Sequence, residues 1–301
     1  MSKDPGEDKN YVPHLALLAV QIFFGSLPVI GKVVLAVIPS VALVGFRVGI
    51  TAFVLFIFQR SRGNLRLEKR GDYRRLAVLS IFGVTINQLL FVGGLSLTKA
   101  SNTSLLAVTI PIFALTIGAV VGVEKLSALK IFGIAMAAVG VILLIDPSNA
   151  SFSSATTLGD LMIVINSLSY GIYVATSKDV LTRNGAVKSM AWLFIFASVV
   201  CVPIGFYSMS GVEIGSIQTT IWLLILYIAI VATALPYLFN AWALARLNPS
   251  TVAVYIYLQP VIGFLLATAL LRETVGLNFL AAALLIFAGV YLVTKNLTRH
   301  E

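Results

Sequence analysis

Long apolar stretches separated by short polar links make up most of the chain. The stretches are about 20 residues long, and none alternates strictly between apolar and polar positions. A helix of that length spans the hydrocarbon core of a bilayer and satisfies its own backbone hydrogen bonds, whereas a membrane strand needs a period of two. The pattern predicts an all-α integral membrane protein with ten transmembrane helices: His14–Val33, Ser40–Gln59, Leu76–Leu97, Ser101–Gly122, Ala128–Ile145, Leu158–Lys178, Ser189–Met209, Thr220–Leu244, Ser250–Leu271 and Leu277–Thr294.

The amino-acid composition limits the kinds of chemistry that the protein can carry out. Of the 301 residues, 59% are hydrophobic and 11% are charged, whereas about 25% are charged in soluble domains. The single cysteine, Cys201, and the distant His14 and His300 argue against an internal disulfide or a histidine metal site. Neither a phosphate-binding glycine loop nor an interfacial cluster of His, Asp, Glu or Cys occurs in the sequence. We therefore expect no enzymatic activity, no metal and no other cofactor.

The net charge of +9 does not indicate a nucleic-acid partner, because of where the basic residues lie. Counting the links alternately, 17 Lys and Arg fall on one side of the membrane and three on the other, with Arg47 inside a span. The densest group, seven residues, lies between Arg60 and Arg75. Basic links face the cytoplasm. We expect a multi-pass protein of the plasma (inner) membrane, with cytoplasmic N- and C-termini.

The chain matches itself at a spacing of 149 residues. The fourth and fifth spans then align without a gap on the ninth and tenth, pairing Ser101 with Ser250, Pro111 with Pro260, Glu124 with Glu273, Gly140 with Gly289, Val141 with Val290 and Leu143 with Leu292. At the start of each half a spacing of 146 pairs Gly25 with Gly171 and Lys32 with Lys178. Five spans per half is an odd number, so the halves, residues 1–146 and 147–301, are predicted to be inverted repeats. Inverted repeats are common in secondary transporters, although duplication also builds channels and inert scaffolds.

These paired motifs resemble those of the drug/metabolite transporter superfamily, EamA type, over essentially the whole chain. Length and span pattern are similar to its YddG-like exporters of aromatic and other neutral amino acids. The resemblance implies a ten-helix bundle of two inverted repeats around a central cavity, with the fifth and tenth helices set apart from it.

Polar and aromatic side chains inside spans are the candidate substrate-binding residues, because a polar group facing lipid is costly. Amides and phenols can hydrogen-bond a zwitterion, and tyrosine rings can stack on an aromatic side chain. Each candidate can equally well form a helix-to-helix hydrogen bond; Tyr255 and Gln259 are the pair that we favour as functional. The candidates are Gln21, Asn87, Gln88, Asn102, Thr103, Asn166, Tyr170, Tyr173, Tyr237, Asn240, Tyr255 and Gln259.

The remaining candidate functional residues inside the predicted spans are prolines and one arginine. Proline removes a backbone donor and can kink a helix, so Pro28, Pro111, Pro236 and Pro260 are candidate hinges or kinks. Arg47, the only charge near the centre of a span, can meet a substrate carboxylate or serve structure by snorkelling or bonding backbone carbonyls. Lys32, Lys178 and the two glutamates at span ends are interpreted as anchors at the interface.

The sequence thus predicts a secondary transporter or exporter of small neutral metabolites, mainly aromatic and other neutral amino acids, working by alternating access. Its partners are the small-molecule substrate and the lipid bilayer, and a compact bundle can work as a monomer. Transport of a sugar phosphate, a nucleotide sugar or a drug stays open, as does a non-transporting role. The coupling also stays open between facilitated diffusion and proton antiport, and facilitated diffusion is at least as well supported, because no carboxylate lies deep within a span.

Overall fold

The computed structural model describes residues 11–99, 102–103, 106–145, 156–262 and 277–295. Within these ranges the chain is helical and contains no strand. The first half comprises α1 (Val12–Leu35), α2 (Ser40–Arg62), α3 (Arg70–Ser80), η1 (Ile81–Thr85), α4 (Ile86–Leu97), α6 (Thr109–Val120) and α7 (Ala128–Ile145). The second half comprises α8 (Thr157–Asn184), α9 (Ala186–Ser208), η3 (Ile214–Ser216), α10 (Thr219–Ala229), η4 (Ile230–Ala234), α11 (Leu235–Leu244), α12 (Pro249–Val254), η5 (Tyr255–Tyr257) and α14 (Leu277–Lys295).

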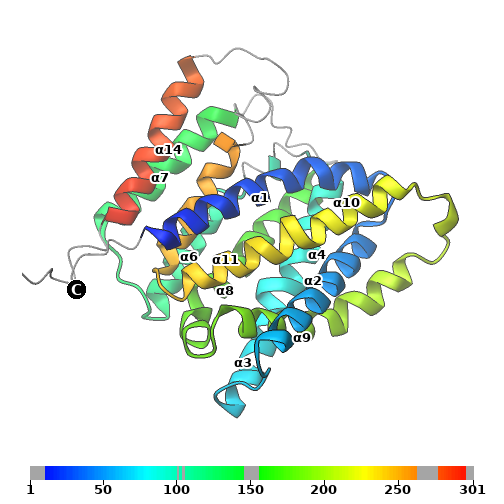
Figure 1. Ribbon diagram of the computed structural model, residues 1–301. Coiled ribbons are helices and arrows are strands. Elements are labelled where there is room, and N and C mark those ends of the chain that lie inside the picture. Colours follow the sequence, from blue (N-terminus) through cyan, green and yellow to red (C-terminus); the bar gives the residue numbers. More distant parts are fainter. Residues whose placement is uncertain (1–10, 100–101, 104–105, 146–155, 263–276, 296–301) are drawn as a thin grey trace, which may run out of the picture.

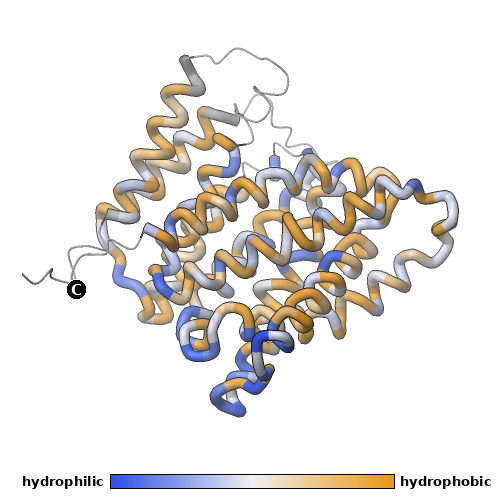
Figure 2. The backbone as a smooth tube through the Cα atoms, in the orientation of Figure 1, coloured by the Kyte–Doolittle hydropathy of each residue, from blue (hydrophilic) through white to orange (hydrophobic). Residues whose placement is uncertain are grey.

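Six helices in the described part are long and apolar enough to cross a membrane. They are α1, α2, α8, α9 and two continuous helices that each contain a π-turn, α3–η1–α4 and α10–η4–α11. The helices of the other four predicted spans are shorter, and parts of the fourth and ninth spans lie outside the described residues. Large apolar side chains face outward, for example Phe53 at 67% exposure, and Figure 2 shows the helices as mainly hydrophobic with hydrophilic links. An apolar exterior of this extent suits a lipid environment.

Close helix packing uses glycine. A Cβ atom on Gly45 of α2 would lie 2.8 Å from the Cα of Gly205 in α9, and one on Gly133 of α7 would lie 2.9 Å from the carbonyl oxygen of Gly289 in α14. Small residues let membrane helices approach closely and gain van der Waals contact. Figure 1 shows α7 and α14 side by side at one end of the molecule, away from the long helices α1, α10 and α11.

Two π-helical turns interrupt the third and eighth predicted spans, a feature that the hydrophobic pattern did not indicate. They are η1 and η4, which start at Ile81 and Ile230, 149 residues apart. The flanking helices keep that spacing, since α10 begins 149 residues after α3 and α11 begins 149 residues after α4. A π-turn widens the helix and is frequent at functional sites.

The glycines paired at the 146 spacing have matching neighbours. Gly25 of α1 faces Ile262 of the ninth predicted span, and Gly171 of α8 faces Phe113 of α6. Ile262 and Phe113 are themselves 149 residues apart. Ser101 and Glu273, by contrast, lie outside the described residues.

Candidate functional site

A cavity lies among the long helices, bounded by α1, α2, α4, α6, α8, α11 and the ninth predicted span. The centre of a water molecule can occupy about 100 Å³ of it, which is room for several waters, since one water needs about 10–15 Å³ by the same measure. Its lining is mixed. One part is apolar, including Phe24, Leu27, Phe91, Ile110, Ile163 and Ile256, and the rest is polar.

Nine of the twelve substrate-binding residues predicted from sequence line this cavity. They come from six of the predicted spans, and the helical packing brings them together: Gln21, Asn87, Gln88, Thr103, Asn166, Tyr170, Tyr237, Asn240 and Gln259. Their convergence is compatible with ligand binding. Polar groups inside a bundle also bond to each other.

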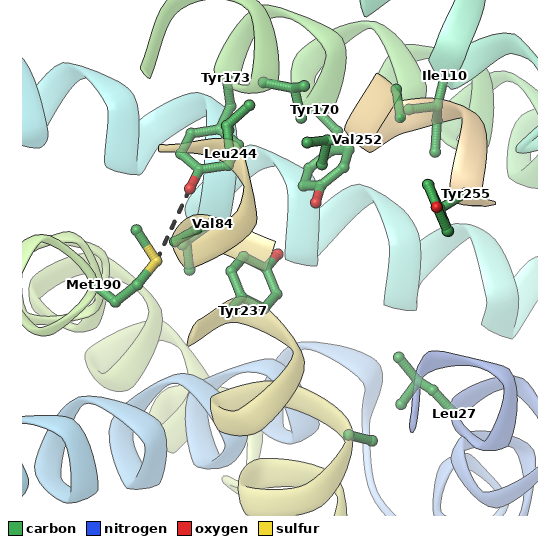
Figure 3. Close-up of a cluster of buried hydrophobic side chains, with 14 of the residues drawn as sticks. Leu27, Val84, Ile110, Tyr170, Tyr173, Met190, Tyr237, Leu244, Val252 and Tyr255 are labelled. Carbon is green, nitrogen blue, oxygen red and sulfur yellow. Dashed lines mark hydrogen bonds between the residues drawn. The ribbon is translucent and has the colours of Figure 1, made fainter. Parts of the chain in front are cut away.

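The other three predicted residues do not line the cavity. Tyr173 lies one helical turn beyond Tyr170, and its hydroxyl group is directed at the sulfur of Met190, 3.9 Å away (Figure 3). The hydroxyl group of Tyr255 is 2.7 Å from His14 Nδ1. Two side chains three positions apart on an α-helix point in directions about 60° apart. This difference is enough to turn Tyr173 toward a neighbouring helix.

Asn102, the third of these residues, belongs to a separate polar cluster. Its amide nitrogen donates to Asp160 Oδ1 at 3.0 Å, and the hydroxyl group of Thr98 donates to the same oxygen at 2.6 Å. The ammonium of Lys32 donates to the carbonyl oxygen of Thr98 at 2.9 Å. These contacts tie the ends of α1 and α4 to the start of α8, so a structural role accounts for Lys32 and Asn102.

Tyr237 is the centre of the polar network in the cavity. Gln88 Nε2 donates to its hydroxyl oxygen at 2.7 Å. The hydroxyl group in turn lies 3.0 Å from both Asn87 Oδ1 and the carbonyl oxygen of Gly83, either of which can accept its proton. Gly83 belongs to η1, and the π-turn presents this carbonyl to another helix.

The remaining amides also direct their nitrogen atoms at protein acceptors. Asn166 Nδ2 donates to the carbonyl oxygen of Asn87 at 2.7 Å, and Asn240 Nδ2 donates to the hydroxyl group of Tyr170 at 2.8 Å. Gln259 Nε2 donates to Gln21 Oε1 at 2.8 Å. Within the described part of the chain, the amide oxygens of Asn166, Asn240 and Gln259 have no protein donor. These three amide oxygens on the polar face of the cavity are therefore open to hydrogen-bond donors of a ligand.

Arg47 also lines the cavity, although we did not count it among the predicted binding residues. It is 1% exposed, and its Nε donates to Thr233 Oγ1 at 2.9 Å. No snorkelling is possible for a side chain buried so completely. The sequence feature that could have identified Arg47 as a cavity residue is its isolated charge within an apolar span.

The predicted hinge prolines occupy different settings. Pro28 lies inside α1 and lines the cavity. Pro111 is in the first turn of α6, where it does not interrupt the helix. Pro236 directly follows η4 and lies inside the continuous helix Thr219–Leu244, where it removes a backbone donor. Pro260 follows the η5 turn and lines a second, smaller cavity beside Tyr257.

Glu124 differs from the interfacial anchor expected from sequence. Its side chain is 1% exposed and pairs with the ammonium of Lys130 at 2.6 Å. It also accepts hydrogen bonds from the backbone N–H of Ser250, at 3.0 Å, and from the Ser250 hydroxyl group. The carboxylate is therefore buried at a contact between the two halves of the chain. A charge at the end of an apolar run looks alike in sequence whether it faces water or a neighbouring helix.

Comparison with known proteins gives a family match to both halves. The EamA-like transporter family matches residues 12–146 and, again, residues 157–295. An uncharacterized transporter from Archaeoglobus fulgidus is 24% identical over 288 residues, which cover 95% of this chain and 99% of that protein. A probable amino-acid metabolite efflux pump from Salmonella typhimurium is 29% identical over 290 residues, covering 92% of this chain and 93% of the pump.

One solved crystal structure is similar in fold. It superimposes with a TM-score of 0.78 over 96% of this chain and 99% of its own, at 17% sequence identity. At that identity the likeness concerns the fold alone.

Proposed function

Because the chain belongs to the EamA-like transporter family and is therefore a membrane transporter, we propose that it is a secondary transporter that exports small neutral metabolites, chiefly aromatic and other neutral amino acids. The observation that carries this proposal is the cavity, in which amides and tyrosines from both halves of the chain meet an apolar wall. Such a lining suits a molecule of no net charge with an apolar side chain.

We also propose that the two halves, residues 1–146 and 147–301, are inverted five-helix repeats of one ten-helix membrane domain. The family matches each half, and η1 and η4 begin 149 residues apart. Two pairs of residues at that spacing touch: Gln88 with Tyr237, and Val108 with Tyr257, whose hydroxyl group donates to the Val108 carbonyl oxygen at 2.8 Å. Equivalent residues touch where a twofold axis passes between them. In alternating access, the two repeats would exchange conformations, so that the same cavity opens first to one side of the membrane and then to the other.

Aromatic rings support the preference for aromatic substrates. Phe24 and Tyr237 line the cavity with their ring centroids 6.0 Å apart in an edge-to-face arrangement. A substrate ring packed against them would gain about 0.5–1.5 kcal/mol beyond its area burial. A preference of that size permits broad specificity. The relative described as a probable amino-acid metabolite efflux pump agrees with this substrate class.

A sugar phosphate or nucleotide sugar is the alternative substrate class. A phosphate dianion is usually bound by several basic groups. Among the described residues that line the cavity, Arg47 is the only basic one. This favours the amino-acid proposal over the phosphate alternative.

Flux measurements with purified protein in liposomes test the proposal. Labelled phenylalanine should equilibrate faster than across empty vesicles without an imposed proton gradient, and other neutral amino acids should compete. Thr103→Trp, which fills the cavity, should abolish this flux, whereas Thr116→Trp on the exposed face of α6 should preserve it. Competition by a sugar phosphate, with none by aromatic amino acids, would overturn the substrate assignment. Flux that requires a proton gradient would identify proton coupling in place of facilitated diffusion.

A further inference from the structure

Arg47 carries a buried positive charge that the protein does not neutralise within the described residues. The ion pairs of that part of the chain join other side chains. The Nη1 group of Arg47 is buried and has no hydrogen-bond partner there. A buried charge without a counter-ion costs several kcal/mol, and proteins rarely retain one without a function.

The guanidinium group is held in a fixed direction. Thr233 belongs to η4, and its hydroxyl group donates to the carbonyl oxygen of Ile228 at 2.7 Å, so its oxygen is oriented to accept from Arg47 Nε. The hydroxyl group of Thr51, one turn along α2, donates to the carbonyl oxygen of Ala229 at 2.8 Å. The π-turn thus anchors α2 and one edge of the guanidinium group together. Among the described residues, Nη1 on the opposite edge of the group has no protein acceptor.

We propose that Arg47 is the carboxylate-binding residue of the cavity, so that the transporter selects substrates by their carboxylate group. Arg47 is the only charged residue among those described that line the cavity. A carboxylate in the cavity would supply the missing counter-ion, and a guanidinium group binds carboxylates by two parallel hydrogen bonds. This inference rests on the proposed transport function and narrows its substrate class.

The rest of an amino acid would find weaker partners. Its ammonium group could donate to the amide oxygens of Asn166, Asn240 and Gln259, which are neutral. The carboxylate and the guanidinium group are opposite charges joined by two parallel hydrogen bonds, whereas the ammonium group would bond only to neutral oxygens. The carboxylate should therefore matter more than the amino group, and a monocarboxylate that lacks the amino group should still bind. An amine that lacks the carboxylate keeps the contacts with these amide oxygens but is repelled by the positive charge of Arg47, which no carboxylate then offsets.

Two analogues of phenylalanine, one without the amino group and one without the carboxylate, separate these contributions. In proteoliposomes, 3-phenylpropionate should compete with labelled phenylalanine, whereas 2-phenylethylamine should not. Arg47→Gln should reduce phenylalanine flux about tenfold or more, since a charge-assisted hydrogen bond is lost, and should remove the advantage of 3-phenylpropionate over the amine. Arg47→Lys keeps the charge without the planar pair of donors, so it should retain the preference with weaker competition. Equal competition by the amine and the carboxylate in the wild-type protein would overturn the proposal.

A binding measurement without flux keeps the proposal separate from the transport function. In detergent, 3-phenylpropionate should raise the Tm of the wild-type protein, because a ligand that binds the native state stabilises it. It should not raise the Tm of Arg47→Met, whose folding the apolar side chain supports at a buried position. An equal shift in both proteins would refute the carboxylate site. If the wild-type protein transports no amino acid but still shows the Arg47-dependent shift, the proposed substrate fails while the carboxylate site stands.

Discussion

Gln88 and Tyr237 lie 149 residues apart in the sequence, and Gln88 Nε2 donates a 2.7 Å hydrogen bond to the Tyr237 hydroxyl oxygen on the lining of the cavity. The same spacing separates η1 from η4, the π-turns that come shortly before these two residues. The bond therefore joins matching positions of the two halves at the cavity itself. A conformational change in which the two halves exchange their arrangements must therefore alter this hydrogen bond.

Removal of the Tyr237 hydroxyl group should weaken both the network and transport. In Tyr237→Phe, Gln88 Nε2 loses its acceptor, and either the Gly83 carbonyl oxygen or Asn87 Oδ1 loses its donor. We expect a loss of about 1–2 kcal/mol in unfolding free energy and a lower rate of phenylalanine flux. Thermal unfolding in detergent and proteoliposome flux measure the two effects. Tyr207→Phe, at a position that is 82% exposed, should change neither. A fully active, equally stable Tyr237→Phe variant would contradict this role.

The orientation in the membrane can be tested by labelling. Positive-inside bias places the link around Asn64 in the cytoplasm and the link around Gly215 on the other side. Both positions are exposed. Because Cys201 is buried, Cys201→Ala provides a background in which single cysteines at Asn64 and Gly215 should react with an impermeant thiol reagent from opposite sides. Reaction from the same side would refute the ten-span topology and the inverted repeat together.

Gln259 and Tyr255, paired in the sequence interpretation, should now behave differently. Gln259 lines the cavity and bonds to Gln21, whereas Tyr255 bonds to His14. Gln259→Ala should reduce phenylalanine flux several-fold while leaving the folded protein in the membrane. Tyr255→Phe removes one hydroxyl group outside the cavity and should affect flux less, so it serves as the matched control. If Tyr255→Phe impairs flux more than Gln259→Ala, then Tyr255 has the larger role in transport.

Glu124 should be a stability determinant. In Glu124→Gln, the ammonium of Lys130 loses its partner in a buried setting, and breaking a buried pair from one side costs about 3–5 kcal/mol. We expect a markedly lower Tm in detergent. The double variant Glu124→Gln with Lys130→Met removes both charges and should regain most of that loss. If the single variant is as stable as the wild-type protein, the ion pair contributes little to the fold.

The sequence by itself determined that the chain is helical, that several of its segments are apolar enough to cross a membrane, and which polar groups avoid lipid. Span length and apolar content are local properties, so the long helices α1, α2, α8 and α9 follow directly from them. Polar residues such as Gln21 and Asn166 could be assigned to the interior, because lipid would not tolerate them. The spacing of 149 residues was also legible in sequence, through pairs such as Pro111 and Pro260.

Only the tertiary structure decided which of these groups meet. Tyr170 and Tyr173 look equivalent in sequence, yet one lines the cavity and the other bonds to Met190. Arg47 is positioned by Thr233, 186 residues away, through a π-turn that no hydrophobic pattern indicates. Such partners depend on the crossing and rotation of whole helices, and one extra residue in a turn rotates every side chain beyond it. Hydrophobicity places a helix in the bilayer, but the packing between helices selects the face that it presents to the cavity.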